Sequence, residues 1–476
     1  MSENNKTDIS KVVKLSSSIV NGLVTFVTNL FLPRVLSITE YGVFDFLQTF
    51  FTNTINILDS GSSTYFYTRL VRKNYNIGYY LYYMIFIFVT LFILGTLFWG
   101  FNLFKNINTT IYIVYLSVVQ TFLYWLINIF QKFYDSISFT AYSETIFSVI
   151  KIINLLLLLY LFSINIKGLG INLARDIIFI LLMFIISILI YKHSSYFIKI
   201  NFKKIKFNDY IDLFNYTKPL FITSIFNSIL LIWEKSLLIS NTDIKQIAIF
   251  SVSYKFMLFG TFLTVSLSQL YFKEITYLLD CDNSSELVSN FINKRVYKLY
   301  ILSAIISCIL FFQASNIINL LYPVEYINSA NVLRLLSIYP IFHVYGQIGN
   351  GIFLVNGNTK YYSKLTITAF ISGIVFIYLF ISNSFLGLGI YGLALKTVLV
   401  QIVTVFFGLK KLSKIFKFNL FALIFKLLFT LFTIFLLMFF LKLLVSLFFN
   451  NEYELFIYCT FIIGILFIKR KILFNI

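Results

Sequence analysis

Eight charged side chains of this 476-residue chain lie within or at the ends of long apolar runs. An ionised group at the centre of a bilayer costs about 2.5–3.5 kcal/mol on insertion scales, so each needs a partner, a ligand or water. Ammonium and guanidinium groups bind anionic oxygens, whereas carboxylates take up protons or cations. The cations are Lys255, Lys396, Lys235, Arg34, Lys151 and Arg334, and the carboxylates are Asp59 and Glu234.

Lys255 and Lys396 are the deepest of the cations. Each lies about ten residues inside its apolar run, which is about 15 Å at the rise of an α-helix. Neither amine can easily reach an interface from that depth. The two residues are therefore interpreted either as members of ion pairs that hold helices together or as cavity-lining groups that bind an anion.

The other cations are less deep, and each keeps two interpretations. Lys151 lies about seven residues from the end of its run and is either structural or cavity-lining. Glu234 and Lys235 project about 100° apart on a helix, so one can face a cavity while the other pairs elsewhere. Arg34 and Arg334 lie near outer helix ends, where they either reach the interface or bind the same anion.

The polar run from Asp59 to Thr64 interrupts an apolar stretch. One interpretation is a helix kink or a close helix contact at Gly61. The other is that Asp59 couples transport to a cation. Arg175, Lys426 and Lys442 lie within about two turns of a helix end, and we expect their side chains to extend to the interface.

Membrane-spanning helices must position these side chains. With 59% hydrophobic and 12% charged residues and a mean hydropathy of +0.87, the chain is far more apolar than a soluble domain. Because a span needs about 20 apolar residues, the sequence predicts an all-α polytopic membrane protein with about fourteen transmembrane helices. The predicted spans are 15–36, 41–66, 77–101, 111–131, 144–162, 171–191, 213–240, 246–272, 297–321, 331–355, 364–383, 386–409, 420–448 and 453–468.

The net charge of +19 is explained by topology rather than by nucleic acid, because the cations cluster between the apolar runs. With a cytoplasmic N-terminus, the inner connections carry about 25 Lys and Arg residues. The outer connections carry only Arg34, Lys105, Lys167 and Lys245. This asymmetry predicts that both termini are cytoplasmic. The run after the polar segment 1–14 is longer than a signal-peptide core, which indicates a retained first helix.

A short motif recurs in the two halves. Gly168-Leu169-Gly170-Ile171 opens the sixth span, and Gly387-Leu388-Gly389-Ile390 opens the twelfth, 219 residues later. The matching order predicts two six-helix bundles related by a pseudo-twofold along the membrane normal, followed by two C-terminal helices. The predicted domains are an N-terminal lobe (1–192), a basic cytoplasmic linker (193–212), a C-terminal lobe (213–411) and two peripheral spans with a tail (412–476). The linker is either a solvated connection or a site for anionic lipid headgroups.

Several motifs together resemble one family. In chain order they are Leu32-Pro33-Arg34-Val35-Leu36, Glu40-Tyr41-Gly42-Val43-Phe44, Asp59-Ser60-Gly61, Trp233-Glu234-Lys235, Leu321-Tyr322-Pro323-Val324-Glu325-Tyr326 and Gly387-Leu388-Gly389-Ile390-Tyr391-Gly392. The pattern is similar to the polysaccharide-lipid flippases, the O-antigen (Wzx-like) transporters of the multidrug/oligosaccharidyl-lipid/polysaccharide (MOP) superfamily. Two segments differ from it, because the family often has Asp-Arg at Glu234-Lys235 and Gly-x-Tyr at Ala248-Ile249-Phe250.

The resemblance implies two bundles around a central, often cationic cavity that is open alternately to each side. It implies a flippase of the bacterial inner membrane that moves an undecaprenyl-pyrophosphate-linked oligosaccharide, an O-antigen or capsule repeat unit, to the periplasmic leaflet. The anionic oxygens of such a substrate require cations and hydrogen-bond donors, for which the six Lys and Arg residues are candidates. Asp59 and Glu234 are candidates for ion coupling. Membrane lipids, a polysaccharide polymerase and a chain-length regulator are the expected partners, and nucleic acid is not.

Two other functions are considered. A membrane O-antigen polymerase or acyltransferase is expected to expose catalytic residues on a sizeable loop, but the outer connections are short, and His193 and His343 lack an HxxxH or HxxxxD partner. A multidrug exporter of the same superfamily would share the architecture, but deep lysines repel organic cations. The chain has no GxxxxGK[ST] segment for a nucleotide, and its three cysteines show no zinc spacing. We therefore expect no enzyme activity, no cofactor and no metal.

Overall fold

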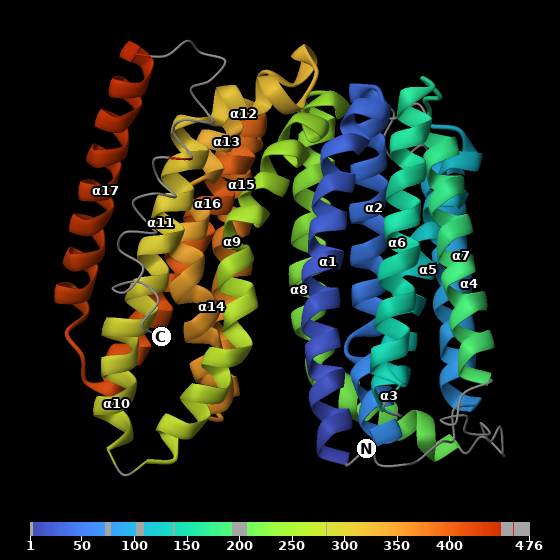
Figure 1. Cartoon of the computed structure of the whole chain (residues 1–476), viewed down its shortest axis with the longest axis horizontal. Helices are drawn as coiled ribbons and strands as arrows, with labels where there is room; N and C mark the ends of the chain where they lie inside the picture. Colours follow the sequence, from blue (N-terminus) through green and yellow to red (C-terminus); the bar gives the residue numbers. More distant parts are fainter. Residues whose placement is uncertain are drawn as a thin grey trace. The chain divides into compact units, whose positions relative to one another are not determined.

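The computed structural model describes residues 3–71, 78–100, 109–136, 139–192, 207–281, 283–448 and 460. These residues form long helices joined by short connections, and none of them forms a strand (Figure 1). Ten of the helices are long and apolar enough to cross a membrane. The chain is therefore an all-α polytopic membrane protein, which confirms the predicted fold class.

The contacts divide the chain into two compact units, Met1–Ala248 and Ile249–Ile476. The helices of unit 1 are α1 (Glu3–Val35), α2 (Ile38–Asp59), α3 (Ser62–Val71), α4 (Gly78–Gly100), α5 (Ile111–Ser136), α6 (Thr140–Ser163), α7 (Leu169–Lys192) and α8 (Phe207–Asn241), with the first turn of α9 (Ile244–Leu279). Unit 2 holds the rest of α9, then α10 (Ser284–Phe291), the π-helical turn η1 (Ile292–Val296), α11 (Tyr297–Phe312), α12 (Ala314–Leu321), the 3-10 turn η2 (Val324–Tyr326), α13 (Ser329–Leu336), α14 (Tyr339–Val355), α15 (Thr359–Ile381), α16 (Gly389–Phe416) and α17 (Leu420–Phe448).

The boundary between these units differs from the predicted linker at 193–212, because α8 packs along α2 and α3 of unit 1. Residues 193–206 lie outside the described residues. The predicted domains are the lobes that would move during transport, whereas the two units are defined by residue contacts. The predicted domain boundaries therefore stay a prediction.

Most predicted spans correspond to one helix, but three are broken. The second predicted span divides at Ser60 and Gly61 into α2 and α3, since both residues have positive φ (39° and 85°). The ninth divides at Gln313 into α11 and α12, and the tenth begins with α13 before the chain turns into α14 at Pro340. The fourteenth span, 453–468, lies outside the described residues apart from Thr460.

The predicted spans leave residues 273–296 between them as a connection, but the structure makes most of this segment helical. The structure continues α9 to Leu279 and starts α10 at Ser284, so that only a short connection remains. Arg295 forms an ion pair with Glu274, and this side-chain contact bridges the two helices of the hairpin.

The start of α2 explains two residues of the Glu40-Tyr41-Gly42 motif. Ser37 and Glu40 form a capping box in which Ser37 N donates to Glu40 Oε2 at 3.0 Å. Glu40 Oε1 also accepts a bond from Leu169 N at 3.3 Å, so one carboxylate joins the first turns of α2 and α7. A Cβ at Gly42 would lie 2.4 Å from Ile244 O, so the backbone approach requires glycine.

The two halves repeat one pattern of packing. In unit 1, α5 packs against α4 and α7, and α6 packs against α7. In unit 2, α14 packs against α11 and α16, and α15 packs against α16. Gly168 and Gly387, the first residues of the recurring motif, both have positive φ (132° and 56°). These matching features support the predicted internal duplication.

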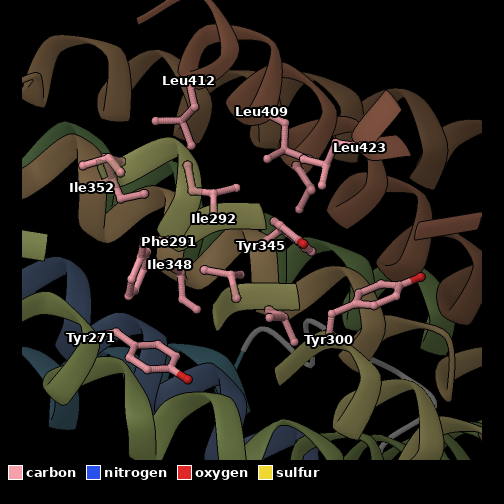
Figure 2. Packing of buried hydrophobic residues seen from close by; sticks show 14 of the residues in the cluster. Tyr271, Phe291, Ile292, Tyr300, Tyr345, Ile348, Ile352, Leu409, Leu412 and Leu423 are labelled. Atoms are coloured by element: carbon pink, nitrogen blue, oxygen red, sulfur yellow. The ribbon is translucent and has the colours of Figure 1, made fainter. Parts of the chain in front are cut away.

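A large apolar cluster forms the core of unit 2 (Figure 2). Buried residues from α9, η1, α11, α14, α16 and α17 meet there, and Ile292, Ile348 and Leu412 are at most 2% exposed. The helix α17 lies at the edge of this unit, beside α11 (Figure 1). Most of its large side chains are exposed, as expected for a helix that faces lipid.

Candidate functional site

Polar side chains form stripes along three long helices of unit 1. Gln48, Thr52 and Asn56 recur every four residues on α2, and Gln120, Tyr124 and Asn128 do the same on α5. Residues four apart lie on one face of a helix. Thr25, Thr28 and Asn29 extend the pattern to α1. Each stripe must therefore meet protein or water rather than lipid.

These stripes line one cavity of about 400 Å³, which is within the size range of small-molecule sites. Its wall contains six carboxamides, four threonines, two aromatic residues with polar atoms and two charged residues. They are Asn29, Gln48, Asn56, Gln120, Asn128 and Asn154; Thr25, Thr28, Thr52 and Thr121; Tyr124 and Trp125; and Lys151 and Asp176. Apolar residues of α1 and α2 complete the wall. The cavity lies entirely within unit 1.

Asp176 is saturated by neighbouring donors. Its Oδ1 accepts from Arg175 Nη2 at 2.8 Å and from Asn154 Nδ2 at 3.0 Å, and its Oδ2 accepts from Gln120 Nε2 at 2.9 Å. Arg175 and Asp176 form a buried ion pair, with side-chain exposures of 3% and 12%. This pair is neutral as a whole, so Asp176 contributes little net charge to the cavity.

Lys151 is the charged group of the cavity wall that lacks such a partner. Within the described part of the chain, its ammonium forms no hydrogen bond or ion pair, and the Glu144 carboxylate, seven residues earlier on α6, attracts it electrostatically. That separation is about 10 Å along the helix axis. Because α6 begins at Thr140, Lys151 lies at the middle of the helix and is deeper than the sequence predicted.

Two lining residues also carry buried atoms without hydrogen-bond partners among the described residues. They are Trp125 Nε1 and Asn154 Oδ1. Buried polar atoms of native proteins are rarely left unpaired, and sites for polar ligands are one reason for exceptions. The donor and acceptor chemistry of the wall therefore suits a neutral or singly anionic polar ligand.

Lys235 lies in a different environment, between α8 and α2. Its Nζ forms an ion pair with Asp45 and donates to Thr49 Oγ1 at 2.6 Å. Both charged side chains are nearly enclosed, at 12% and 11% exposed. The neighbouring Glu234 is 4% exposed.

Asp59 ends α2 and caps α3. Its carboxylate accepts bonds from Ser62 Oγ, from Ser63 N at 3.0 Å and from Ser63 Oγ at 2.9 Å. Lys132 Nζ donates to Ser63 Oγ at 2.7 Å. The kink interpretation of this segment is consistent with these bonds, which satisfy the first turn of α3 after the break at Gly61.

Lys255 on α9 and Lys396 on α16 both belong to unit 2, as the sequence predicted. Lys396 is 5% exposed, whereas Lys255 is half-buried. Arg34 lies over the Phe31 ring at 5.4 Å, in the last turn of α1. Arg334 donates to Asn331 Oδ1 and to Ser315 Oγ, each at 2.6 Å.

The interface interpretation of Arg175 is wrong, because its side chain is buried beside Asp176. Lys426 Nζ lies 3.7 Å from the centre of the Tyr297 ring and donates to Asn293 O at 3.3 Å. Lys442 Nζ donates to Phe312 O at 3.3 Å. Both lysines of α17 therefore bind α11 and its π-helical turn, which the sequence did not indicate.

Of the predicted cations, the structure brings only Lys151 to the cavity of unit 1. Sequence reasoning missed Asp176 and all of the amides. The four-residue spacing of polar side chains on α2 and α5 was a usable signal, because polar residues that recur on one face of a spanning helix indicate a hydrophilic surface.

The comparisons with known proteins agree on the fold. No protein-family model matches the chain, and no curated protein matches it. An inward-facing multidrug resistance MATE family transporter of the MOP superfamily is similar over 86% of this chain and 99% of its own, at 15% identity and a TM-score of 0.69. The lipid II flippase MurJ, in an inward closed conformation, is similar over 97% of this chain and 99% of its own, at 16% identity and a TM-score of 0.68.

A MATE structure in a bent conformation is similar over 87% of this chain and 96% of its own, at 14% identity and a TM-score of 0.53. These likenesses show that the chain has the fold of MOP superfamily transporters. The fold is shared by a multidrug transporter and a lipid II flippase, so the substrate must be argued from the site.

Proposed function

We propose that the chain is a flippase that moves a lipid-linked sugar across a bacterial inner membrane by alternating access. The observation that carries this proposal is the cavity of unit 1, whose wall presents six carboxamides and four threonines. Amides and hydroxyls match the hydroxyl groups of a sugar, which cannot enter hydrocarbon without hydrogen bonds. The MOP fold, which a lipid II flippase shares, supports the same proposal.

A multidrug exporter is the second candidate, because a multidrug transporter has the same fold. The charges of the cavity favour a sugar over an organic cation. Asp176 is occupied by Arg175, Asn154 and Gln120, and Lys151 repels positive charge. An enzyme is disfavoured by the fold of its structural relatives, which are described as transporters and a flippase.

Other parts of the proposal rest on the sequence. Lys255 and Lys396 would hold the pyrophosphate of an undecaprenyl-linked oligosaccharide, with Lys235, Arg34 and Arg334 as further candidates. An ion gradient would drive reorientation. Because Asp59 caps α3, Glu234 becomes the leading coupling carboxylate. The polymerase and the chain-length regulator stay expected partners.

The test uses two lining amides that bind no other described side chain. Asn29→Leu and Gln48→Leu remove hydrogen-bonding groups from the wall and leave the bonds of the fold intact. In cells that depend on this protein, each variant should abolish surface polysaccharide and cause the lipid-linked sugar to accumulate. Gln246→Leu, outside the cavity on α9, is the matched control and should have no effect.

Protein levels in the membrane must be equal for the comparison. Normal surface polysaccharide in both cavity variants would reject the flippase function for this cavity. If the same variants instead lost resistance to an organic cation such as ethidium, the exporter would be the better interpretation.

A further inference from the structure

A second cavity of unit 1, of about 560 Å³, is separate from the polar cavity. It is lined by the first turns of α5 and α7, by the last two turns of α6 and by Glu40 in the first turn of α2. In the described part of the chain, the two cavities share no lining residue. Tyr112, Ile171 and Ile178 line the second cavity and are exposed, so it opens at the outer surface of the unit.

The second cavity has the position and the length of a site for a lipid headgroup and the start of its chains. Its walls come from helix ends, and α7, one of the candidate spans, lines it from Leu169 to Phe179, about 15 Å along the helix axis. The ends of spanning helices lie near the lipid headgroups, and the following turns lie in hydrocarbon. Most of the lining side chains are apolar, as a wall beside acyl chains requires.

Arg175 lines this cavity and carries hydrogen-bond donors that the protein leaves unpaired. Its side chain is 3% exposed, and Nη2 donates to Asp176 Oδ1 at 2.8 Å. The buried Nε and Nη1 atoms have no hydrogen-bond partner among the described residues. Because buried donors are rarely left unpaired, a ligand in the second cavity is the expected source of acceptor oxygens. A phosphate group suits the planar guanidinium best.

Glu40 places the opposite charge in the same cavity. Within the described residues it forms no ion pair with Arg175, and its carboxylate accepts hydrogen bonds from the neutral donors Ser37 N and Leu169 N. Asp176 already compensates the charge of Arg175, so the Glu40 carboxylate leaves the cavity with an excess of negative charge. A ligand with only an anionic group would be repelled, whereas a zwitterionic ligand would satisfy both side chains.

We propose that the second cavity binds a phospholipid with a phosphoethanolamine headgroup. Its phosphate accepts hydrogen bonds from Arg175, its ammonium pairs with Glu40, and an acyl chain lies against Leu157, Leu161 and Phe179. A primary ammonium donates hydrogen bonds to a carboxylate, which the trimethylammonium of a phosphocholine headgroup cannot do. This lipid is a resident ligand and not the cargo, so the site does not depend on the proposed function.

The experiment measures which lipids stay bound to the full chain. The protein is released from nanodiscs that contain phosphatidylethanolamine, phosphatidylcholine and phosphatidylglycerol in equal amounts, and the retained lipids are counted by native mass spectrometry. The native protein should retain phosphatidylethanolamine about tenfold over each of the others, as expected for a charge-assisted hydrogen bond. Glu40→Gln should reduce this preference to about one to one, because glutamine keeps the capping box at Ser37 and removes the charge.

A second variant blocks the cavity. Ala174→Phe places a ring among the lining residues and should abolish retention of phosphatidylethanolamine. Ile185→Phe is the matched control, since Ile185 is an exposed residue of α7 outside the cavity, and it should retain the lipid like the native protein. Arg175 is left unchanged because it also neutralises Asp176 in the wall of the polar cavity.

Three outcomes would overturn the proposal. They are equal retention of the three lipids by the native protein, an unchanged preference in Glu40→Gln, and unchanged retention in folded Ala174→Phe. If Ala174→Phe does not fold, Glu40→Gln alone decides. The proposed function is tested separately, because Asn29→Leu and Gln48→Leu alter the polar cavity and should leave lipid retention at the native level.

Discussion

The ion pair between Lys235 and Asp45 joins a helix to a neighbour that is distant in the sequence. It connects α8 to α2 inside unit 1, and Thr49 accepts a further bond from the same ammonium. Because both side chains are almost enclosed, removing the Asp45 carboxylate would leave the Lys235 ammonium without its ion-pair partner in a poorly solvated place. Breaking such a pair is far more costly than breaking one at the surface.

We predict that Asp45→Asn lowers the free energy of unfolding by about 3 kcal/mol, because it leaves the Lys235 ammonium without its partner. The measurement is the thermal stability of the protein in detergent. Asp212→Asn is the control, since it breaks an ion pair with Arg69 in which Asp212 is 57% exposed, and it should cost less than about 1 kcal/mol. Equal effects of the two substitutions would contradict the structural role of Lys235.

At the scale of elements, α17 shows how an apolar helix is placed on its neighbour. Its outward face is built from exposed Phe and Leu side chains, which specify no position along α11. Lys426 and Lys442 donate to the carbonyls of Asn293 and Phe312, at opposite ends of the segment from η1 to α11. Tyr300 on α11 donates in return to Leu427 O at 2.8 Å. These polar contacts fix the register of two helices that van der Waals packing alone would leave free to slide.

We expect the double substitution Lys426→Met and Lys442→Met to loosen α17, because each methionine keeps an unbranched apolar side chain but removes the ammonium that donates to the carbonyl. The free energy that holds α17 against α11 should fall by about 1–3 kcal/mol for each hydrogen bond removed. Cysteine cross-linking between α11 and α17 reports this loosening. The double variant should show a lower yield and a broader set of cross-linked positions. Lys414→Met, an exposed lysine in the last turn of α16, is the control. Unchanged cross-linking in the double variant would mean that apolar packing alone fixes α17.

At the scale of the whole molecule, the asymmetry of cations predicts the orientation in the membrane. Paired reporters, one active only in the periplasm and one only in the cytoplasm, should place residues 167 and 383 in the periplasm and residue 414 in the cytoplasm. Positions 108 and 206, which lie outside the described residues, should be periplasmic and cytoplasmic. A cytoplasmic result at 383 would overturn the count of spans, because every later connection would change sides.

The predicted internal duplication also belongs to this scale. The pairs α5–α7 and α14–α16, and α6–α7 and α15–α16, occupy equivalent places in the two halves. The polar cavity of the described residues, however, has Lys151 and Asp176 on the unit 1 copies of these helices. The equivalent helices of unit 2 are α15 and α16, and there the buried charged residue is Lys396 on α16. A shared architecture has therefore been given different polar groups in each half.

The sequence by itself determined that the solvent of this protein is mostly lipid, and it predicted the position and order of most helices. Hydrophobic periodicity and the length of apolar runs are local properties, and a lipid environment allows few alternatives to a helix. The break after Asp59 was also predictable, because Gly61 tolerates a positive φ that residues with a Cβ avoid. Lys255, Lys396 and Lys151 stood out for the same reason, since a charge in an apolar run is visible without a structure.

Only the tertiary structure decided which of these charges share a site. Asp176 reaches Gln120 on α5 and Asn154 on α6, which are 56 and 22 residues away in the chain, and no local pattern encodes that meeting. Arg175 was misjudged by its distance from a helix end, although its neighbour Asp176 holds it in the interior. Depth in a membrane follows from position along one helix, but pairing depends on which faces of different helices pack together, and that is a property of the whole fold.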